Sequence, residues 1–380
     1  MNILEEIQNC PVEWKELGGV CSVNKGKQLN KNLLIDDGLY PAYNGGQTYS
    51  GRTNDYNVEA NTIIVSQGGA SAGFVNFVET KFWANAHCYY LLPDETQVKN
   101  RFVYHFLKMN QKYLMDFQHG AGIPALKSDK LTKLLIPVPP LKIQEKIVQI
   151  LDKFTDYVTE LTSELTSRKK QYSYYRDKLL SFEDEVYQVE WKMLDVVSEK
   201  TTNISWNKIG DDEKFKYIDL SSVDRFSNKI IETTSITKLT APSRAQKIVK
   251  SDDIILGTTR PTLKRFTKIT DDYNDQICST GFYVFRTNGQ VLPNYVYHIF
   301  SSSDFYKYLE ENQSGASYPA ISDALVKKYK IPVPSLEIQS RIVQVLDNFD
   351  MVCNDLNIGL PKEIELRQKQ YEYFRDKLLT

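Results

Sequence analysis

The chain has 380 residues, which corresponds to two or three domains of ordinary size. Its 41% hydrophobic residues can build real cores, and its 24 Tyr and 17 Phe residues argue against disorder. The 47 basic and 48 acidic side chains leave a formal net charge of −1, which excludes a bulk polycation. Any binding of nucleic acid therefore has to depend on local patches or on a basic partner.

The sequence shows neither a membrane segment nor a disulfide framework. Its first residues lack the basic and apolar regions of a signal peptide, and no stretch approaches 18 apolar residues. The five cysteines are odd in number and scattered, without a CxxC pair. We therefore expect a cytoplasmic protein with free thiols.

The first part of the chain, about residues 11–135, alternates short apolar runs with turns. Its β-branched and aromatic runs at 62–65 and 88–92 predict strands, and the apolar spacing from 100 to 111 predicts a helix. The Pro-rich run IPVPP at 136–140 ends this part. The pattern is typical of a compact α+β domain.

A long helix is predicted after the Pro-rich run. Apolar residues recur there at steps of three and four with one stutter, and no Gly or Pro interrupts residues 143–180. Such a helix would extend about 57 Å at 1.5 Å per residue. Its apolar seam consists of Ile143, Ile147, Ile150, Phe154, Tyr157, Leu161, Leu165, Tyr172, Tyr175 and Leu179.

The rest of the chain repeats this order. Strands are predicted at 254–256 and 282–285 and a helix at 293–305, before the run IPVP at 331–334 and a second helical seam from Ile338. Gly359 and Pro361 lie within that second helical segment, so we expect it to break or kink there.

Matching motifs establish an internal duplication. VEWK at 12–15 recurs at 189–192, IPVP at 136–139 recurs 195 residues later, and YYRDKLL at 174–180 recurs as YFRDKLL at 373–379. A unit of about 190 residues is too long for a solenoid repeat, so it indicates two copies of one domain followed by a helix.

The predicted fold class is therefore α+β, with two similar globular domains joined by two long antiparallel helices in a coiled coil. A pseudo-twofold axis would relate the two copies. We expect the first globular domain at residues 1–140, the first helix at 141–181, the second globular domain at 182–335 and the second helix at 336–380.

No catalytic constellation stands out. The (Asp/Asn)-Pro-Pro-(Tyr/Phe) motif of amino-group methyltransferases does not occur, the P-loop pattern fails at Gly26-Lys27, and no HExxH zinc motif occurs. The four histidines are scattered, and we interpret His105 and His298, at matched helical positions, as packing residues. The sequence therefore predicts a protein without catalytic residues, metal ligands or a cofactor of its own.

The run IPVPPLKIQEKIVQILD at 136–152 and its echo from 331 to 347 resemble the start of the repeated helical region in specificity subunits of type I restriction-modification enzymes. The runs YPAYNGG at 40–46, NTIIVS at 61–66, FWAN at 82–85 and DDIILGTTR at 252–260 are similar to target-recognition segments of this family. The resemblance covers nearly the whole chain, in the family order of recognition domain, helix, recognition domain, helix.

The resemblance implies a non-catalytic reader of double-stranded DNA. Each globular domain would read one half of a bipartite site, and the paired helices would set the spacer. Two modification subunits, each holding S-adenosylmethionine and methylating adenine, would dock on the helices. Restriction subunits, which use ATP and Mg²⁺, would complete the complex.

Base readout needs polar side chains on loops that reach the groove edges. Residues 201–270 carry 13 basic and 8 acidic side chains, which favours a basic patch in the second domain. Such loops would read bases while nearby cations hold phosphates. The candidates are Tyr43, Asn44, Gln47, Ser66 and Gln67 for bases and Arg52 and Lys81 for phosphates in the first domain, with Thr258, Thr259 and Arg260 for bases and Lys264 and Arg265 for phosphates in the second.

The two copies differ where SQGG at 66–69 aligns with GTTR at 257–260. Different loops on one scaffold predict two different half-sites and hence an asymmetric target. The basic clusters at 168–170 and 367–369 have two interpretations, as DNA-backbone contacts or as solvated and partner-docking faces. One alternative for the whole chain is a coiled-coil scaffold that joins two protein-binding domains and has no DNA role. Another is a specificity chain without an active partner.

Overall fold

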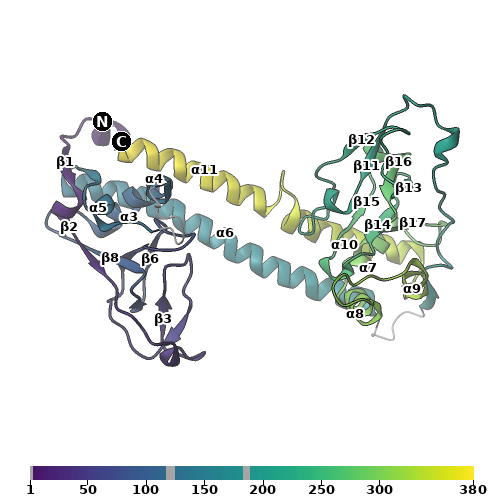
Figure 1. Cartoon of the computed structure of the whole chain (residues 1–380), viewed down its shortest axis with the longest axis horizontal. Helices are drawn as coiled ribbons and strands as arrows, with labels where there is room; N and C mark the ends of the chain where they lie inside the picture. The colour runs from purple at the N-terminus through teal and green to yellow at the C-terminus, as the bar shows by residue number, and fades with distance from the viewer. Residues whose placement is uncertain (1–2, 117–124, 183–188) are drawn as a thin grey trace. The chain divides into compact units, whose positions relative to one another are not determined.

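The computed structural model describes residues 3–116, 125–182 and 189–380. The chain divides into two compact units (Figure 1), one of residues Met1–Glu160 and Ile364–Thr380 and the other of residues Leu161–Glu363. Each unit therefore contains one globular domain together with parts of both long helical segments.

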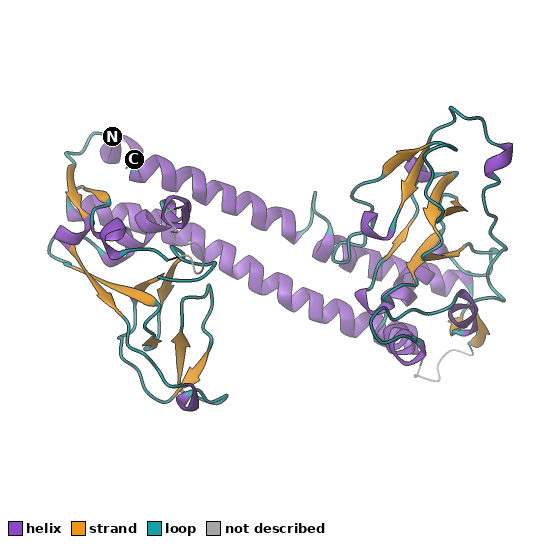
Figure 2. Cartoon of the chain, viewed as in Figure 1, coloured by secondary structure: helices purple, strands orange, loops and turns teal. Residues whose placement is uncertain are grey.

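The first globular domain is built on three small sheets (Figure 2). A four-stranded antiparallel sheet has the order β2-β8-β5-β6, a three-stranded sheet has the order β4-β3-β7 with β3 parallel to β7, and β1 pairs with β9. The strands are β1 (Glu13–Glu16), β2 (Cys21–Lys25), β3 (Tyr40–Tyr43), β4 (Gly51–Thr53), β5 (Thr62–Ser66), β6 (Val75–Val78), β7 (Trp83–Ala84), β8 (Cys88–Pro93) and β9 (Leu135–Val138). The helices are α1 (Ile3–Gln8), α2 (Leu17–Val20), α3 (Asn100–Met109), α4 (Gln111–Asp116) and α5 (Ser128–Thr132).

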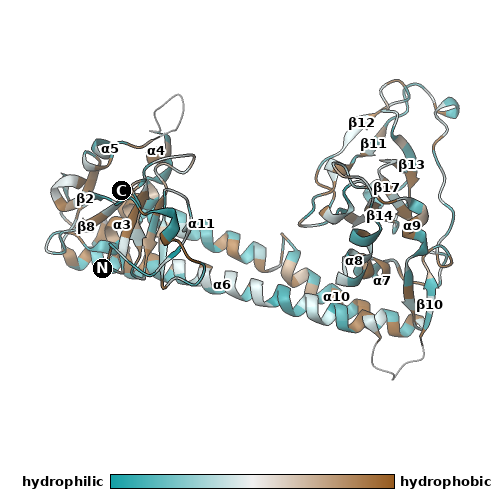
Figure 3. Cartoon of the chain, turned by 60° about the horizontal axis from the view of Figure 1, so that its bottom comes forward, coloured by the Kyte–Doolittle hydropathy of each residue, from teal (hydrophilic) through white to brown (hydrophobic). Residues whose placement is uncertain are grey.

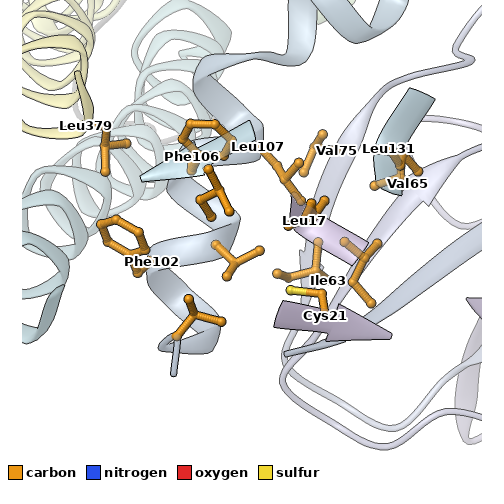
Figure 4. Packing of buried hydrophobic residues seen from close by; sticks show 14 of the residues in the cluster. Leu17, Cys21, Ile63, Val65, Val75, Phe102, Phe106, Leu107, Leu131 and Leu379 are labelled. Atoms are coloured by element: carbon orange, nitrogen blue, oxygen red, sulfur yellow. The ribbon is translucent and has the colours of Figure 1, made fainter. Parts of the chain in front are cut away.

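The core of this unit lies between the four-stranded sheet and α3. Every residue of β5 is buried, which fits its apolar run at the centre of the sheet. Figure 4 shows Phe102, Phe106 and Leu107 of α3 between the strands and Leu379 near the end of the chain. The same cluster includes Ile143 and other residues of the long helix, so the domain and its helices share one core.

The second globular domain repeats this plan, but its sheet with the parallel strand pair has four strands rather than three. Its sheets have the orders β15-β14-β17, β12-β11-β16-β13 and β10-β18, and β11 is parallel to β16 as β3 is to β7. The strands are β10 (Glu190–Met193), β11 (Phe215–Ile218), β12 (Thr234–Ile236), β13 (Ala245–Val249), β14 (Ile254–Gly257), β15 (Phe266–Lys268), β16 (Gln276–Ser279), β17 (Phe282–Phe285) and β18 (Lys330–Val333). The helices are α7 (Pro293–Ser301), α8 (Ser303–Asn312) and α9 (Asp323–Lys328).

The strands predicted at 62–65, 88–92, 254–256 and 282–285 are confirmed as β5, β8, β14 and β17. The two predicted globular helices are shorter than expected, because each is followed by a break and a second helix. Ser302 has an extended backbone and ends α7, and its hydroxyl accepts the N–H of Phe305 as the N-cap of α8. In the first domain Asn110 separates α3 from α4.

The first long helix, α6, runs without interruption from Leu141 to Ser181, whereas the second helical segment is broken. It consists of α10 (Leu336–Asn354) and α11 (Leu360–Leu379), which confirms the break expected near Gly359. A Cβ on Gly359 would lie 2.5 Å from the carbonyl oxygen of Met351, so the backbone of α10 leaves no space for a side chain there. Figure 3 shows the hydrophobic positions of α6 as separate bands between hydrophilic ones.

The helices pair in opposite directions. In the first unit the early part of α6 packs on the late part of α11, where the rings of Phe154 and Phe374 stack at 5.2 Å. In the second unit the late part of α6 packs on α10, where Tyr172 and Phe349 stack at 6.3 Å. The chain therefore has two similar α+β domains joined by long antiparallel helices, as predicted. Leu151, beside the predicted seam, is fully buried because the globular domain covers this face of α6 as well.

Candidate nucleic-acid interface

The end of β3 and the loop after it carry three residues predicted to contact DNA. The ring of Tyr43 is half-buried, with its centroid 5.6 Å from that of Phe82, and burial raises the pKa of the Tyr43 hydroxyl. Asn44 and Gln47 are exposed. The side chains of Asn44 and Gln47 are therefore open to a ligand, whereas the Tyr43 ring supports the loop from the domain core.

Ser66 and Gln67 lie at the end of β5 and hold loops together. The Ser66 side chain is buried, and its hydroxyl donates to the carbonyl of Gly46 at 3.1 Å. The N–H of Gln67 donates to the carbonyl of His87 at 2.8 Å, and its own carbonyl accepts from Leu126 at 2.7 Å. The structure thus brings the two predicted loops of the first domain together, with Ser66 as an internal support.

The two phosphate candidates of the first domain already have partners within the protein. Nε of Arg52 donates to the carbonyl of Gly38 at 2.6 Å, and its Nη2 donates to the next carbonyl at 3.0 Å. Nζ of Lys81 donates to the Tyr56 hydroxyl at 2.9 Å and lies 3.1 Å from Oε2 of Glu59, and these contacts raise the pKa of Lys81. Both cations therefore have reduced freedom to bind a phosphate.

The loop after β14 carries the candidates of the second domain. Thr258 is buried, and its hydroxyl donates to the carbonyl of Gly281 at 2.9 Å. Thr259 is half-buried, whereas Arg260 is exposed. The guanidinium carbon of Arg260 lies 4.6 Å from the ring centroid of Tyr318, an aromatic residue that no sequence motif singled out. The position of Tyr318 directly before the duplicated Pro-Ala pair is the sequence feature that could have identified it.

Lys264 and Arg265 follow in the same loop. Nζ of Lys264 lies 4.0 Å from the ring centroid of Tyr306, and desolvation together with the nearby Arg176 lowers the pKa of Lys264. Nε of Arg265 is buried without a hydrogen-bond partner in the described structure. Neither cation forms an ion pair with a described residue, so their charge stays available to an anionic ligand.

The two loops occupy equivalent positions in the two domains. After β5, Gly68 pairs with Ala125 in an isolated bridge, and after β14, Thr259 pairs with Ala320 in the same way. In each case the carbonyl before the bridge accepts the N–H of the residue after the alanine, at 2.7 and 2.9 Å. The runs SQGG and GTTR are therefore equivalent in space, as their alignment predicted, and they present different side chains.

The basic patch predicted at 201–270 is smaller than its composition suggests. Four of its 13 basic side chains form ion pairs with carboxylates, and an ion-paired cation contributes less to a positive potential. The pairs are Lys229–Asp355, Lys238–Asp211, Lys247–Asp323 and Lys268–Asp252. Positive charge in the loop after β14 is not neutralised in this way.

Where the first domain meets its helices, His105 joins a buried network. Its Nε2 lies 2.7 Å from Oδ1 of Asp152 on α6, and its Nδ1 lies 3.0 Å from the hydroxyl of Tyr371 on α11. Burial lowers the pKa of His105, and a neutral ring can donate from Nε2 to the carboxylate while Nδ1 accepts from the tyrosine. Although burial disfavours its charge, hydrogen bonds from His105 and Arg101 hold the pKa of Asp152 below its usual range.

The second unit repeats this network with the two copies exchanged, so that the histidine and aspartate come from the second copy and the tyrosine from the first. Nε2 of His298 lies 2.7 Å from Oδ1 of Asp347 on α10, and its Nδ1 lies 3.1 Å from the hydroxyl of Tyr172 on α6. Both histidine side chains are fully buried, which confirms their interpretation as packing residues. Each histidine therefore connects its own globular domain to the long helical segments of both copies.

The glutamine of the duplicated Pro-rich motif also has a structural role. Gln144 is fully buried, and its Nε2 donates to the carbonyls of Gln97 and Pro139 at 3.0 and 2.8 Å. Its Oε1 accepts the N–H of Lys99 at 2.8 Å. Gln339 makes the same three bonds in the second unit, at 3.1, 2.9 and 2.8 Å. This duplicated bond set fixes the start of each long helical segment on its domain.

Within the described ranges, no group of three or more His, Cys, Asp or Glu side chains could hold a metal ion. Among the helices of these ranges, none is both long enough and apolar enough to cross a membrane.

A duplicated α+β domain with unlike polar loops on a common helical frame defines a modular recognition protein. Residues 11–168 and 190–366 both match the family described as type I restriction modification DNA specificity domain. The chain belongs to this family of type I restriction-modification specificity subunits. The two matched segments coincide with the two copies of the internal repeat.

Comparison with individual proteins agrees with this assignment. The chain is 30% identical to the specificity subunit of the type I restriction enzyme EcoR124I/EcoR124II of Escherichia coli, over 100% of this chain and 97% of that protein. In fold it is similar to the crystal structure of a type I restriction-modification S subunit from M. genitalium, with a TM-score of 0.65, 20% identity and coverage of 98% and 97%. A chain from a study of complex assembly and conformational transition in the type I system gives a TM-score of 0.59, 13% identity and 98% coverage of both chains.

Proposed function

We propose that this chain is the DNA-recognition subunit of a type I restriction-modification complex and that each globular domain reads one half of a bipartite, asymmetric site. The observation that carries this proposal is the pair of equivalent loops after β5 and β14. A common backbone conformation presents a glutamine and two glycines in one copy, and a half-buried threonine and an exposed arginine in the other. Side chains with different donors and acceptors read different bases. The scaffold alternative is not favoured by the family assignment.

The functional segments of this proposal follow the sequence boundaries 1–140, 141–181, 182–335 and 336–380. The uninterrupted α6 has 41 residues, which corresponds to about 60 Å of helix. Such a helix is suited to hold a spacer of unspecified bases between the two half-sites. The chain itself contributes no catalytic residue and no cofactor in this proposal. Modification subunits supply S-adenosylmethionine, and restriction subunits supply ATP and Mg²⁺ chemistry.

Two modification subunits would dock at the two junctions, which are the equivalent places where each globular domain meets the long helices. Trp14 and Trp191 pair with Pro137 and Pro332 in the duplicated two-stranded sheets, and both indole rings are at least half exposed. Trp14 lines a hollow together with Lys377, Leu378 and Leu379 of α11, and Trp191 lines one together with Lys178 and Leu180 of α6. Exposed apolar residues at such hollows favour protein contacts, and their duplication supports two copies of one partner.

The proposal is tested by a base-resolution map of methylated adenines. Cells that carry this chain with its modification partner are compared with cells that lack only this chain. A split motif with two unlike halves, lost on deletion, is the expected result. A motif with two identical halves contradicts the asymmetric site, and an unchanged map together with failure of the purified chain to capture a methyltransferase contradicts the proposal as a whole.

A further inference from the structure

The backbone of the loop after β14 is strained at two cationic residues. Seven described residues other than glycine have a positive φ, and four of them are Asn or Asp, which tolerate this region. Arg260 (φ +49°) and Lys264 (φ +54°) are two of the remaining three, and they flank the short 3-10 turn Pro261–Leu263. Such a conformation costs about 1–3 kcal/mol per residue and persists only where the surroundings impose it.

The equivalent residue in the first domain is a glycine with the same backbone conformation. Gly69 follows the Gly68–Ala125 bridge as Arg260 follows the Thr259–Ala320 bridge, and its φ is +77°. Glycine adopts this conformation without strain. The second copy therefore keeps a backbone suited to glycine but places an arginine on it, which indicates that the arginine side chain is needed there.

A separate turn fixes Arg260 in place. The N–H of Arg260 donates to the carbonyl of Pro319 at 2.7 Å. Ser314 and Ala320 exchange two backbone hydrogen bonds, at 2.9 and 2.8 Å, and so close the turn that carries Tyr318. The loop after β14 and this turn consequently form one structural element.

Tyr318 provides a platform for the arginine without using its hydrogen-bond donors. The Arg260 guanidinium lies 4.6 Å from the centroid of the Tyr318 ring, which is 71% exposed. In the described structure this guanidinium forms neither a hydrogen bond nor an ion pair. Arg52 differs, because its guanidinium donates to two backbone carbonyls. Stacking on a ring limits the motion of a guanidinium while its edge donors remain available.

We propose that Tyr318 is a specificity-determining residue of the second domain, because it holds Arg260 in position to read a guanine in the second half-site. A guanidinium that presents its edge donors matches the O6 and N7 acceptors of guanine in the major groove. Tyr318 acts as a positioning residue, and Arg260 makes the base contact. This inference rests on the proposed function and adds to it the residue pair and the base.

The test uses the full chain with its modification partner and the adenine-methylation map described above. Arg260→Gly restores the residue of the first copy, so thermal stability should be unchanged or higher. The same variant should lose discrimination at one G·C pair of the second half-site by about tenfold or more. Tyr318→Ala should reduce discrimination at that same pair about two- to fivefold, and Tyr318→Phe, which keeps the ring, should retain it.

Phe226→Ala is the matched control, because Phe226 also lies 4.6 Å from an arginine, Arg225, on an exposed loop. It should leave the motif unchanged. If the Arg260→Gly variant still methylates the wild-type split motif, or if Phe226→Ala relaxes that motif to the same extent, this inference is overturned and the proposed function stands. A relaxed position in the first half-site also overturns it. A wild-type map without a split motif overturns the proposed function and this inference together.

Discussion

The junctions between the domains and the helices are nearly identical in the two copies, whereas the loops after β5 and β14 share a backbone and little else. Each junction has a buried glutamine with three bonds and a histidine between an aspartate and a tyrosine. The loops occupy equivalent places but carry SQGG in one copy and GTTR in the other. The duplication has therefore kept the residues that hold each domain on its helices, and it has changed the loops, including the position that is Gly69 in one copy and the exposed Arg260 in the other.

This difference separates two kinds of polar residue. A polar side chain with all its partners inside the protein contributes to the frame, and its loss leaves buried groups without hydrogen bonds. A polar side chain that is exposed and has no such partner contributes to binding.

The largest effect is expected at the duplicated glutamines. Gln144→Ala leaves one N–H and two carbonyls without their partner, and Gln339→Ala does the same in the second unit. Each change should destabilise its unit by about 3 kcal/mol, seen as a lower urea midpoint of unfolding. The exposed Gln149→Ala and Gln344→Ala are matched controls and should change stability by less than about 0.5 kcal/mol. A large effect in only one unit would show that the junctions are not equivalent.

A moderate effect is expected at two buried hydroxyls within the predicted interface. Ser66→Ala and Thr258→Val each remove a hydrogen bond to a backbone carbonyl and should reduce stability by about 1 kcal/mol. Because both side chains are buried, the methylated motif should stay the same. A motif that relaxes in either variant, with stability unchanged, would place that hydroxyl on the DNA instead.

A smaller effect is expected for single phosphate contacts. Lys264→Gln should reduce the slope of log affinity against log salt by about 0.9, since one phosphate contact is lost. Lys81→Gln should change that slope little, because Glu59 already pairs with the ammonium. The measurement is DNA binding by the complex with its modification partner at several salt concentrations. Equal slopes for both variants and the wild type would exclude Lys264 from the phosphate contacts.

The smallest effect is a pH dependence at the first junction. Burial lowers the pKa of His105 from 6.5, so below about pH 6.5 the unfolded chain binds a proton that the folded chain does not. The stability that His105 contributes is therefore present above pH 6.5 and is lost as pH falls through its folded pKa. Because the hydrogen bond and the charge of Asp152 oppose the effect of burial on this pKa, the loss should stay well below the limit of about 1.4 kcal/mol per pH unit.

Unfolding midpoints at pH 7.5, 6.5 and 5.5 measure this loss, and His105→Gln serves as the control. The variant should have a flatter pH profile, whatever its absolute stability. A wild-type midpoint that rises on acidification would mean that the folded state binds the proton more tightly, contrary to the direction of this pKa shift.

Much of the fold follows from the sequence because its signals are local or repeated. The steps of three and four along α6, the strands at 62–65 and 254–256, and the interruption near Gly359 all depend on neighbouring residues. The duplication predicted the number of domains and the antiparallel helices. The ends of α3 and α7 did not follow from periodicity, because a single residue such as Asn110 or Ser302 can separate two helices while the spacing of the apolar residues continues.

The amino-acid sequence is sufficient to show which residue types lie on which loops, and therefore that Asn44, Gln47, Arg260 and Lys264 are candidates for DNA contacts. Which candidates already have hydrogen-bond or ion-pair partners within the protein depends on the tertiary structure. Arg52 binds carbonyls of residues 38 and 39, Lys81 pairs with Glu59, and Ser66 binds Gly46. Those partners lie 13 to 22 residues away along the chain and are brought close only by sheet pairing and loop packing. No local pattern reports such contacts, because hydrogen bonds form between groups that are close in space, whatever their separation in sequence.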